Sequence, residues 1–202
     1  VHPTKAGLKI PEIFDAAINR EVKGLWIIGE DVVQTDPNSA HVAKAMNALD
    51  LLVVQEIFLS ETAKHADVVL PGTTFLEKDG TFTNTERRVQ RVNRAAKPLP
   101  GTKPDGVIVT DMMQKLGYNQ KSYDADEVLA EIADVVPFFK GITRERLGKL
   151  GLQWPVKEDG TDTKILHQKE FKLGKGRIKY FDWKESSEIE KNKKDYPLIL
   201  TT

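Results

Sequence analysis

Acidic and amide side chains follow two apolar stretches of this 202-residue chain, each at the point where a strand is expected to end. Gly29-Glu30-Asp31 comes directly after Leu25–Ile28, and Gln55-Glu56 follows Leu51–Val54. Carboxylates at such positions can accept hydrogen bonds from ribose hydroxyls or from the N–H edge of a base. Acids are common in loops, but two sets at successive strand ends favour a nucleotide-binding edge.

The elements that would position these groups follow the order strand, polar loop, helix and strand between Gly24 and Glu56. Either Asn38 or Ser39 is expected to cap the helix, whose apolar face is Val42, Ala43, Met46 and Leu49. A third short strand is expected over 66–72. Such a unit carries the strands' carboxyl ends to one edge of a parallel sheet, which would bring the acidic turns together, with Thr35 and Gly72 at neighbouring strand ends.

Capping residues, helix-boundary residues such as Pro11 and Gly117, and the spacing of apolar residues predict four further helices. Their ranges are Glu12–Arg20, Gly106–Leu116, Asp124–Val136 and Thr143–Leu150. Residues 73–94 are expected to be irregular and polar, with a turn at Lys78-Asp79-Gly80. Alternation at Arg177–Trp183 predicts an edge strand. Another strand is expected at Tyr196–Thr202.

Composition excludes several classes of protein. Thirty basic and 30 acidic side chains give a formal charge of zero, so no electrostatic argument supports nucleic-acid binding. No apolar run reaches the ~18 residues of a membrane helix, so direct membrane insertion is not expected. With no cysteine, these residues cannot form disulfides, hold cysteine-ligated iron–sulfur clusters or perform thiol catalysis. The four histidines lack metal-ligand spacing, and no glycine-rich phosphate motif is present. We therefore predict neither catalytic nor metal-ligating residues.

Four arginines lie close together in the sequence, and two interpretations stay open. They could contact an anion, or they could form an ordinary solvated face. The residues are Arg87, Arg88, Arg91 and Arg94.

Three longer motifs carry a resemblance to a known family. They are GED-x-x-QTD at 29–36, VVQEIFLSETA-x-x-ADVVLPGTTFLEKDGTFTNTERRVQ at 53–90, and KPD-x-x-I at 103–108. The chain resembles molybdopterin oxidoreductases of the dimethyl-sulfoxide-reductase superfamily, and within it the formate dehydrogenase catalytic (alpha) subunits. The likeness runs through nearly the whole chain. ADVVLP with EKDGTFTNTERRVQ is specific to the superfamily, and GED-x-x-QTD favours the formate dehydrogenase branch.

The resemblance implies an α/β fold: a Rossmann-like three-layer domain with a mainly parallel sheet over 1–140, and a mixed C-terminal extension over 141–202. The domain would hold one guanosine of a bis-molybdopterin guanine dinucleotide carrying molybdenum or tungsten. Asp105 would face the guanine, because a carboxylate can accept hydrogen bonds from the N1–H and N2–H groups of that base. Related sequences often have an aspartate where this chain has Glu56, and a serine where it has Gly72. The resemblance assigns cofactor binding to Gly29, Glu30, Asp31, Thr35, Gln55, Glu56, Ile57, Gly72 and Asp105.

The chain also departs from the family pattern. It lacks the cluster cysteines, the Cys or selenocysteine that ligates the metal, and the carboxy-terminal barrel that would begin at YPLILTT. We therefore expect a middle fragment, inactive alone. Its parent would oxidise formate to CO2 and pass two electrons to iron–sulfur clusters, with the remainder of the subunit and iron–sulfur subunits as partners. The compartment, cytoplasmic or periplasmic, stays open. Alternatives are a cofactor-free scaffold of a respiratory complex, or another member such as a nitrate reductase.

Overall fold

The computed structural model describes residues 3–184, 194–195 and 197–198. Contacts divide the chain into two units, Val1–Lys164 and Ile165–Thr202. All the helices and strands assigned in the described residues lie in the first unit. Its helices are α1 (Ile10–Ile18), α2 (Val32–Thr35), α3 (Ser39–Ala48), α4 (Asp105–Lys115), α5 (Ala125–Val135) and α6 (Arg144–Leu147), with 3-10 turns η1 (Thr62–His65), η2 (Phe75–Glu77) and η3 (Pro137–Phe139). Its strands are β1 (Gly24–Ile28), β2 (Leu51–Glu56), β3 (Val68–Pro71), β4 (Gly80–Thr83), β5 (Arg88–Val92) and β6 (Leu152–Gln153).

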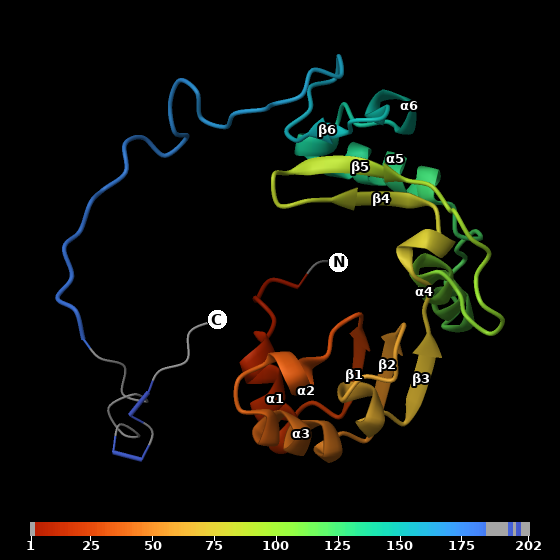
Figure 1. The fold of residues 1–202 in the computed structure, drawn as a ribbon, viewed down its shortest axis with the longest axis vertical. Helices are drawn as coiled ribbons and strands as arrows, with labels where there is room; N and C mark the ends of the chain where they lie inside the picture. Colours follow the sequence, from red (N-terminus) through yellow and green to blue (C-terminus); the bar gives the residue numbers. More distant parts are fainter. Residues whose placement is uncertain (1–2, 185–193, 196, 199–202) are drawn as a thin grey trace. The chain divides into compact units, whose positions relative to one another are not determined.

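The first three strands form the expected parallel sheet, in the order β1-β2-β3 (Figure 1). Ile28 aligns with Gln55, and Gln55 aligns with Leu70, so the three strands end in register. The α/β prediction is therefore confirmed. The strand bounds differ from the expected ones by one or two residues.

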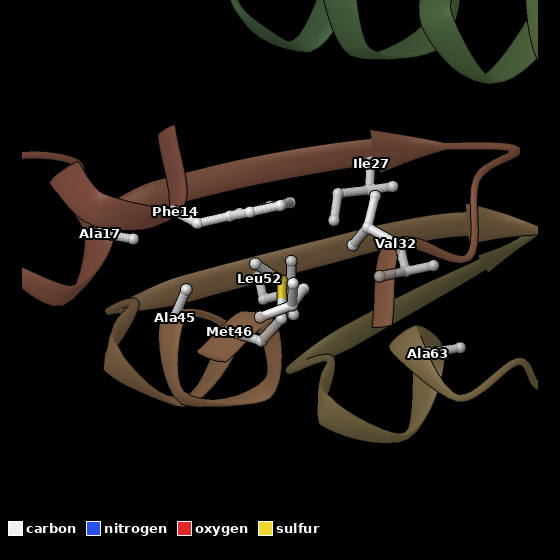
Figure 2. Close-up of a cluster of buried hydrophobic side chains, with 10 residues drawn as sticks. Phe14, Ala17, Ile27, Val32, Ala45, Met46, Leu52 and Ala63 are labelled. Carbon is white, nitrogen blue, oxygen red and sulfur yellow. The ribbon is translucent and has the colours of Figure 1, made fainter. Parts of the chain in front are cut away.

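One face of this sheet is covered by α1 and α3, which pack against each other and against β1 and β2. Phe14 from α1, Met46 from α3 and Leu52 from β2 meet in the buried cluster of Figure 2. The cluster explains the local sequence, because its helical members recur at the spacing of one helix face. The opposite face is more open, and Ile28 and Val68 there are more than two-fifths exposed.

Local capping fixes where the helices begin. The Asn38 side chain accepts from the amide of His41 at 3.3 Å, so Asn38 rather than Ser39 is the cap of α3. Asn38 has φ of +61°, a conformation that asparagine tolerates better than most residues. Asp124 caps α5 by accepting from two amides, as predicted. Thr143 caps α6, which is shorter than expected and ends at Leu147, with Gly148 as its C-cap.

A second sheet forms where the sequence predicted irregular structure. β4 pairs antiparallel with β5, and β5 pairs antiparallel with β6 (Figure 1). This sheet has its own core, made by Val89, Leu129, Ile142, Leu147 and Val156. The prediction for 73–94 was wrong because β4 and β5 are short and polar, and their burial depends on α5 and α6, more than 30 residues away. Residues 141–164 share this core, and the boundary expected at 140 stays a prediction.

The four arginines are used at separate places. The Arg87 guanidinium donates to the carbonyl oxygens of Trp154 and Thr163, and it lies 5.6 Å from the centre of the Trp154 ring. It therefore ties the turn before β5 to the segment after β6. The other three arginines have partners of their own. Arg88 donates a hydrogen bond to the Leu150 carbonyl, Arg91 donates one to the Asn93 side chain, and Arg94 forms an ion pair with Asp79.

In the second unit, the described residues form no helix or strand. The edge strand predicted at Arg177–Trp183 is therefore wrong. Its apolar residues Ile178 and Tyr180 are exposed, so alternation is present without the partner strand or apolar surface that would stabilise it. Most of the strand expected at Tyr196–Thr202 lies outside the described residues. In the part of the chain that the structure describes, no helix has the length and apolarity to cross a membrane.

The core of the first unit predicts unequal effects at two adjacent leucines of β2. Leu52 is 1% exposed and Leu51 is 48% exposed. Leu52→Ala should lower the free energy of unfolding by about 2–5 kcal/mol, because it removes buried methyl groups and leaves a cavity. Leu51→Ala is the matched control and should cost about 1 kcal/mol or less. Urea unfolding followed by circular dichroism measures both, and equal losses would contradict this packing.

Candidate functional site

The carboxyl ends of the three parallel strands are joined by backbone hydrogen bonds. The amide of Gly29 donates to the carbonyl of Gln55 at 2.9 Å, and the amide of Gly72 donates to the carbonyl of Glu56 at 3.0 Å. Gly29 has φ of +64°, which lets the chain turn sharply at the end of β1. The loops after β1, β2 and β3 therefore leave the sheet side by side.

Thr62 joins the loop after β1 to the segment after β2. It is fully buried, and its hydroxyl donates to Asp31 Oδ1 at 2.6 Å while it accepts from the amide of Val33 at 3.0 Å. Asp31 also accepts from the amides of Thr62 and Glu61. The Asp31 carboxylate thus holds these two loops together.

Burial alone would raise the pKa of Asp31. The hydrogen bonds from Thr62 and Glu61 and the charge of Lys64 outweigh that effect, and the pKa lies below its ordinary value. Asp31 is therefore charged at neutral pH, with its oxygens directed at protein donors.

Glu30 and Thr35 contact each other on the exposed side of this loop. The Thr35 hydroxyl lies 2.8 Å from Glu30 Oε1 and 3.1 Å from the carbonyl of Asp31. It has one proton to donate, so the two acceptors share it. Glu30 keeps most of its acceptor capacity toward solvent. The loop expected here contains the one-turn helix α2, which the sequence did not predict.

A second group of side chains meets at the end of β2. The Gln55 amide donates to Asp105 Oδ1 at 2.8 Å, and the Lys78 ammonium donates to Asp105 Oδ2 at 2.5 Å. Gln55 is 0% exposed, whereas Lys78 and Asp105 are partly exposed. Gly72 leaves room for this arrangement, since a Cβ there would lie 3.2 Å from Asp105 Oδ1. Residues distant in sequence therefore fix one carboxylate.

Burial of Asp105 would by itself raise its pKa. The hydrogen bonds from Lys78 and Gln55, together with the Lys78 charge, have the larger effect and hold the pKa below its ordinary value. Asp105 is a carboxylate at neutral pH. Each of its oxygens has a second lone pair available for a further donor.

The other predicted residues at this end are placed differently. Glu56 Oε1 accepts from the amide of Ile57, and the Ile57 side chain is exposed. The amide of Gly72 is already used by the Glu56 carbonyl. The structure thus arranges the predicted residues as two groups, one around Asp31 and one around Asp105, and the sequence did not predict the contacts within them.

A cavity of 190 Å³ opens beside Lys78 and Asp105. Phe82 and Tyr123 form part of its wall. Tyr123 packs against Gly106 in the first turn of α4, where a Cβ would lie 2.1 Å from the ring. Sequence reasoning missed Lys78, Phe82, Tyr123 and Gly106, because only the fold brings them to Asp105. The one signal in the sequence is the EKDG segment, which opens a family motif and in which Lys78-Asp79-Gly80 predicts a turn.

Two buried polar atoms near this edge lack a hydrogen-bond partner among the described residues. They are Gln55 Oε1 and the Thr73 hydroxyl. Unpaired buried polar atoms mark places where water or a ligand completes the hydrogen bonding. Within the same described part of the chain, no group of three or more His, Asp or Glu side chains could hold a metal ion.

Comparison with known proteins decides the family. Residues 2–115 match the family model for molybdopterin oxidoreductases. The chain belongs to the molybdopterin oxidoreductase family. The match covers the parallel sheet, β4, β5 and α4, and hence both groups of site residues.

Similar members of this family are formate dehydrogenase subunits. The chain is 46% identical to the F420-dependent formate dehydrogenase subunit alpha of Methanocaldococcus jannaschii, over 98% of this chain and 30% of that protein. It is 45% identical to the F420-dependent formate dehydrogenase 2 subunit alpha of Methanococcus maripaludis, over 97% of this chain and 29% of that protein. A putative formate dehydrogenase of Staphylococcus haemolyticus is 43% identical over 84% of this chain and 17% of that protein. The chain thus spans less than a third of these relatives' length.

One solved structure shares the fold at low sequence identity. Acetylene hydratase from Pelobacter acetylenicus matches with a TM-score of 0.55 and 20% identity, over 67% of this chain and 19% of that one. At this identity the match supports the fold alone and says nothing about chemistry.

The Asp31 contacts predict a pH-dependent contribution to stability. Because the pKa of Asp31 is depressed in the folded state, its contribution is present above the unfolded pKa and lost as the pH falls through the folded pKa. Asp31→Asn should lower the free energy of unfolding by about 1–2 kcal/mol at neutral pH. The difference from wild type should shrink below about pH 4.

Urea unfolding at a series of pH values measures this difference. Glu30→Gln is the adjacent control and should change stability by no more than about 0.5 kcal/mol. A difference for Asp31→Asn that stays constant down to pH 2 would show that the charge is not responsible.

Proposed function

We propose that this chain is the part of a formate dehydrogenase catalytic subunit that binds the guanosine end of a molybdopterin guanine dinucleotide. The single observation that carries the proposal is the Asp105 carboxylate, fixed by Gln55 and Lys78 at the carboxyl edge of the parallel sheet. Open α/β sheets bind nucleotides at that edge. The similarity to formate dehydrogenases at 42–46% identity supports formate as the substrate, in preference to nitrate.

The predicted residues fit this cofactor as two walls of one site. Gly29, Glu30, Asp31 and Thr35 form the loop after β1, where Glu30 keeps oxygens for a ribose hydroxyl and Asp31 orders the loop. Gln55, Glu56, Ile57 and Gly72 form the ends of β2 and β3. Asp105 faces the base. The unpaired Gln55 and Thr73 oxygens support a polar occupant near this edge.

Asp105 gives the site a physical reason to prefer guanine. Its oxygens can accept from N1–H and N2–H of guanine, whereas adenine has an acceptor at N1 and no amino group at C2. A site built to pair these donors loses affinity for a base that lacks them, because its buried polar groups stay unpaired.

When bound, the pterin cofactor supplies the molybdenum or tungsten centre for two-electron oxidation of formate to CO2. The residues of this chain bind and orient one end of that cofactor. We further propose that the remaining catalytic groups, an iron–sulfur cluster and electron-transfer subunits belong to other parts of the complex.

A scaffold without cofactor is the second candidate, and one observation favours it. Asp31, Asp105 and the amide of Gly72 all have protein partners already. A chain that had lost the cofactor would satisfy its polar groups internally in this way. Nucleotide binding separates the two candidates.

The proposal predicts that the chain binds GDP in preference to ADP. Asp105→Asn should weaken GDP binding by about 5- to 150-fold, since a bidentate base contact is worth about 1–3 kcal/mol. Protein-observed NMR titration up to millimolar nucleotide is suited to this part of a site. Asp111→Asn, on the same helix and paired with Lys103, is the matched control. Equal binding of GDP and ADP would favour the scaffold.

A second consequence concerns activity. The purified chain should show no formate oxidation with an artificial dye acceptor, because its sequence contains no cysteine to ligate a metal or an iron–sulfur cluster. Dye reduction after supply of cofactor and metal measures this. Sustained, formate-dependent turnover would overturn the proposed division of roles.

A further inference from the structure

Lys78 faces the same cavity as Asp105, and the proposed function uses it only to fix the Asp105 carboxylate. The ammonium of Lys78 lies 2.5 Å from Asp105 Oδ2. Its side chain is 24% exposed, and it lines the 190 Å³ cavity together with Phe82 and Tyr123. The two charged groups therefore present a joint edge to whatever occupies the cavity.

The carboxylate of this edge has a fixed orientation. Gln55 is fully buried and donates to Oδ1 from the sheet side, and Lys78 donates to Oδ2. Rotation of the Asp105 carboxylate would break one or both bonds. The free lone pairs of Asp105 and the Lys78 ammonium therefore keep a fixed position relative to each other.

Lys78 retains donors after pairing with Asp105. An ammonium has three N–H groups, and among the described residues Asp105 is its only hydrogen-bond partner. The edge therefore offers two acceptor oxygens followed by a donor. Guanine offers the complementary sequence of N2–H donor, N1–H donor and O6 acceptor.

The walls of the cavity suit a planar base. Phe82 and Tyr123 supply aromatic rings, and bases commonly stack on aromatic side chains. Tyr123 is held in place by close packing on Gly106. Asp79, also in the wall, pairs with Arg94.

We propose that Lys78 is a specificity residue that donates a hydrogen bond to guanine O6 while Asp105 accepts from N1–H and N2–H. This inference rests on the proposed function and adds the third contact of base recognition. Adenine, with an amino group at C6, would place a donor against the ammonium.

The experiment changes one atom of the ligand and one side chain of the protein. In 6-thio-GDP, sulfur replaces O6 as a weaker acceptor, while N1–H and N2–H remain. The wild-type chain should bind GDP about tenfold more tightly than 6-thio-GDP, the effect of one charge-assisted hydrogen bond. In Lys78→Met, the two affinities should agree within about twofold.

Two controls separate a direct contact from a positioning role. IDP retains O6 but lacks the N2 amino group, so Lys78→Met should weaken the binding of IDP by the same factor as the binding of GDP. Lys103→Met removes another lysine paired with an aspartate of α4, Asp111, and should leave the preference for GDP over 6-thio-GDP unchanged. Circular dichroism and thermal unfolding establish that the variants fold.

Each outcome decides a different point. If Lys78→Met weakens the binding of GDP and of 6-thio-GDP by the same factor, Lys78 only positions Asp105, and the inference is overturned. If wild type binds both ligands equally, it is overturned without any variant. If wild type shows no GDP binding at all, the proposed function fails, and the inference fails with it.

Discussion

The parallel alignment of β1, β2 and β3 is the constraint on which the rest of the structure depends. It requires a crossover between strands, and α3 and η1 supply the crossovers. Because all three strands run the same way, their polar ends emerge together, and the backbone bonds at Gly29 and Gly72 fix their order. The side chains that surround Asp105 and Asp31 can meet only because this edge exists.

The parallel sheet could be predicted from the sequence because its signals are local. Four-residue apolar runs with turn residues at their ends locate β1 and β2, and helical spacing locates α3. Caps at Asn38 and Asp124 can be recognised because each acts within three residues of its own position. The family motifs then indicated which strand ends matter, although the roles of individual site residues stay predictions.

The second sheet and the partners of Asp105 could not be predicted, for a different reason. Val89 is buried by Leu129, Ile142 and Val156, which lie 40 or more residues further along the chain. Lys78 reaches Asp105 across 27 residues, and Gln55 reaches it across 50. Such contacts leave no periodic trace in the sequence. The alternating stretch at Arg177–Trp183 shows the converse, since a local pattern without a tertiary partner forms no strand.

The cavity beside Asp105 is built by residues that lie far apart in the sequence. The unfolded chain must close a loop of 27 residues to bring the Lys78 ammonium to the Asp105 carboxylate, and a loop of 50 residues to bring Gln55 to the same carboxylate. A small molecule that requires both groups therefore has no counterpart site on the unfolded chain. By mass action, its binding free energy adds to the stability of the native state alone. The ligand of this cavity would therefore stabilise the folded state, and the thermal midpoint of the domain would rise with the ligand concentration.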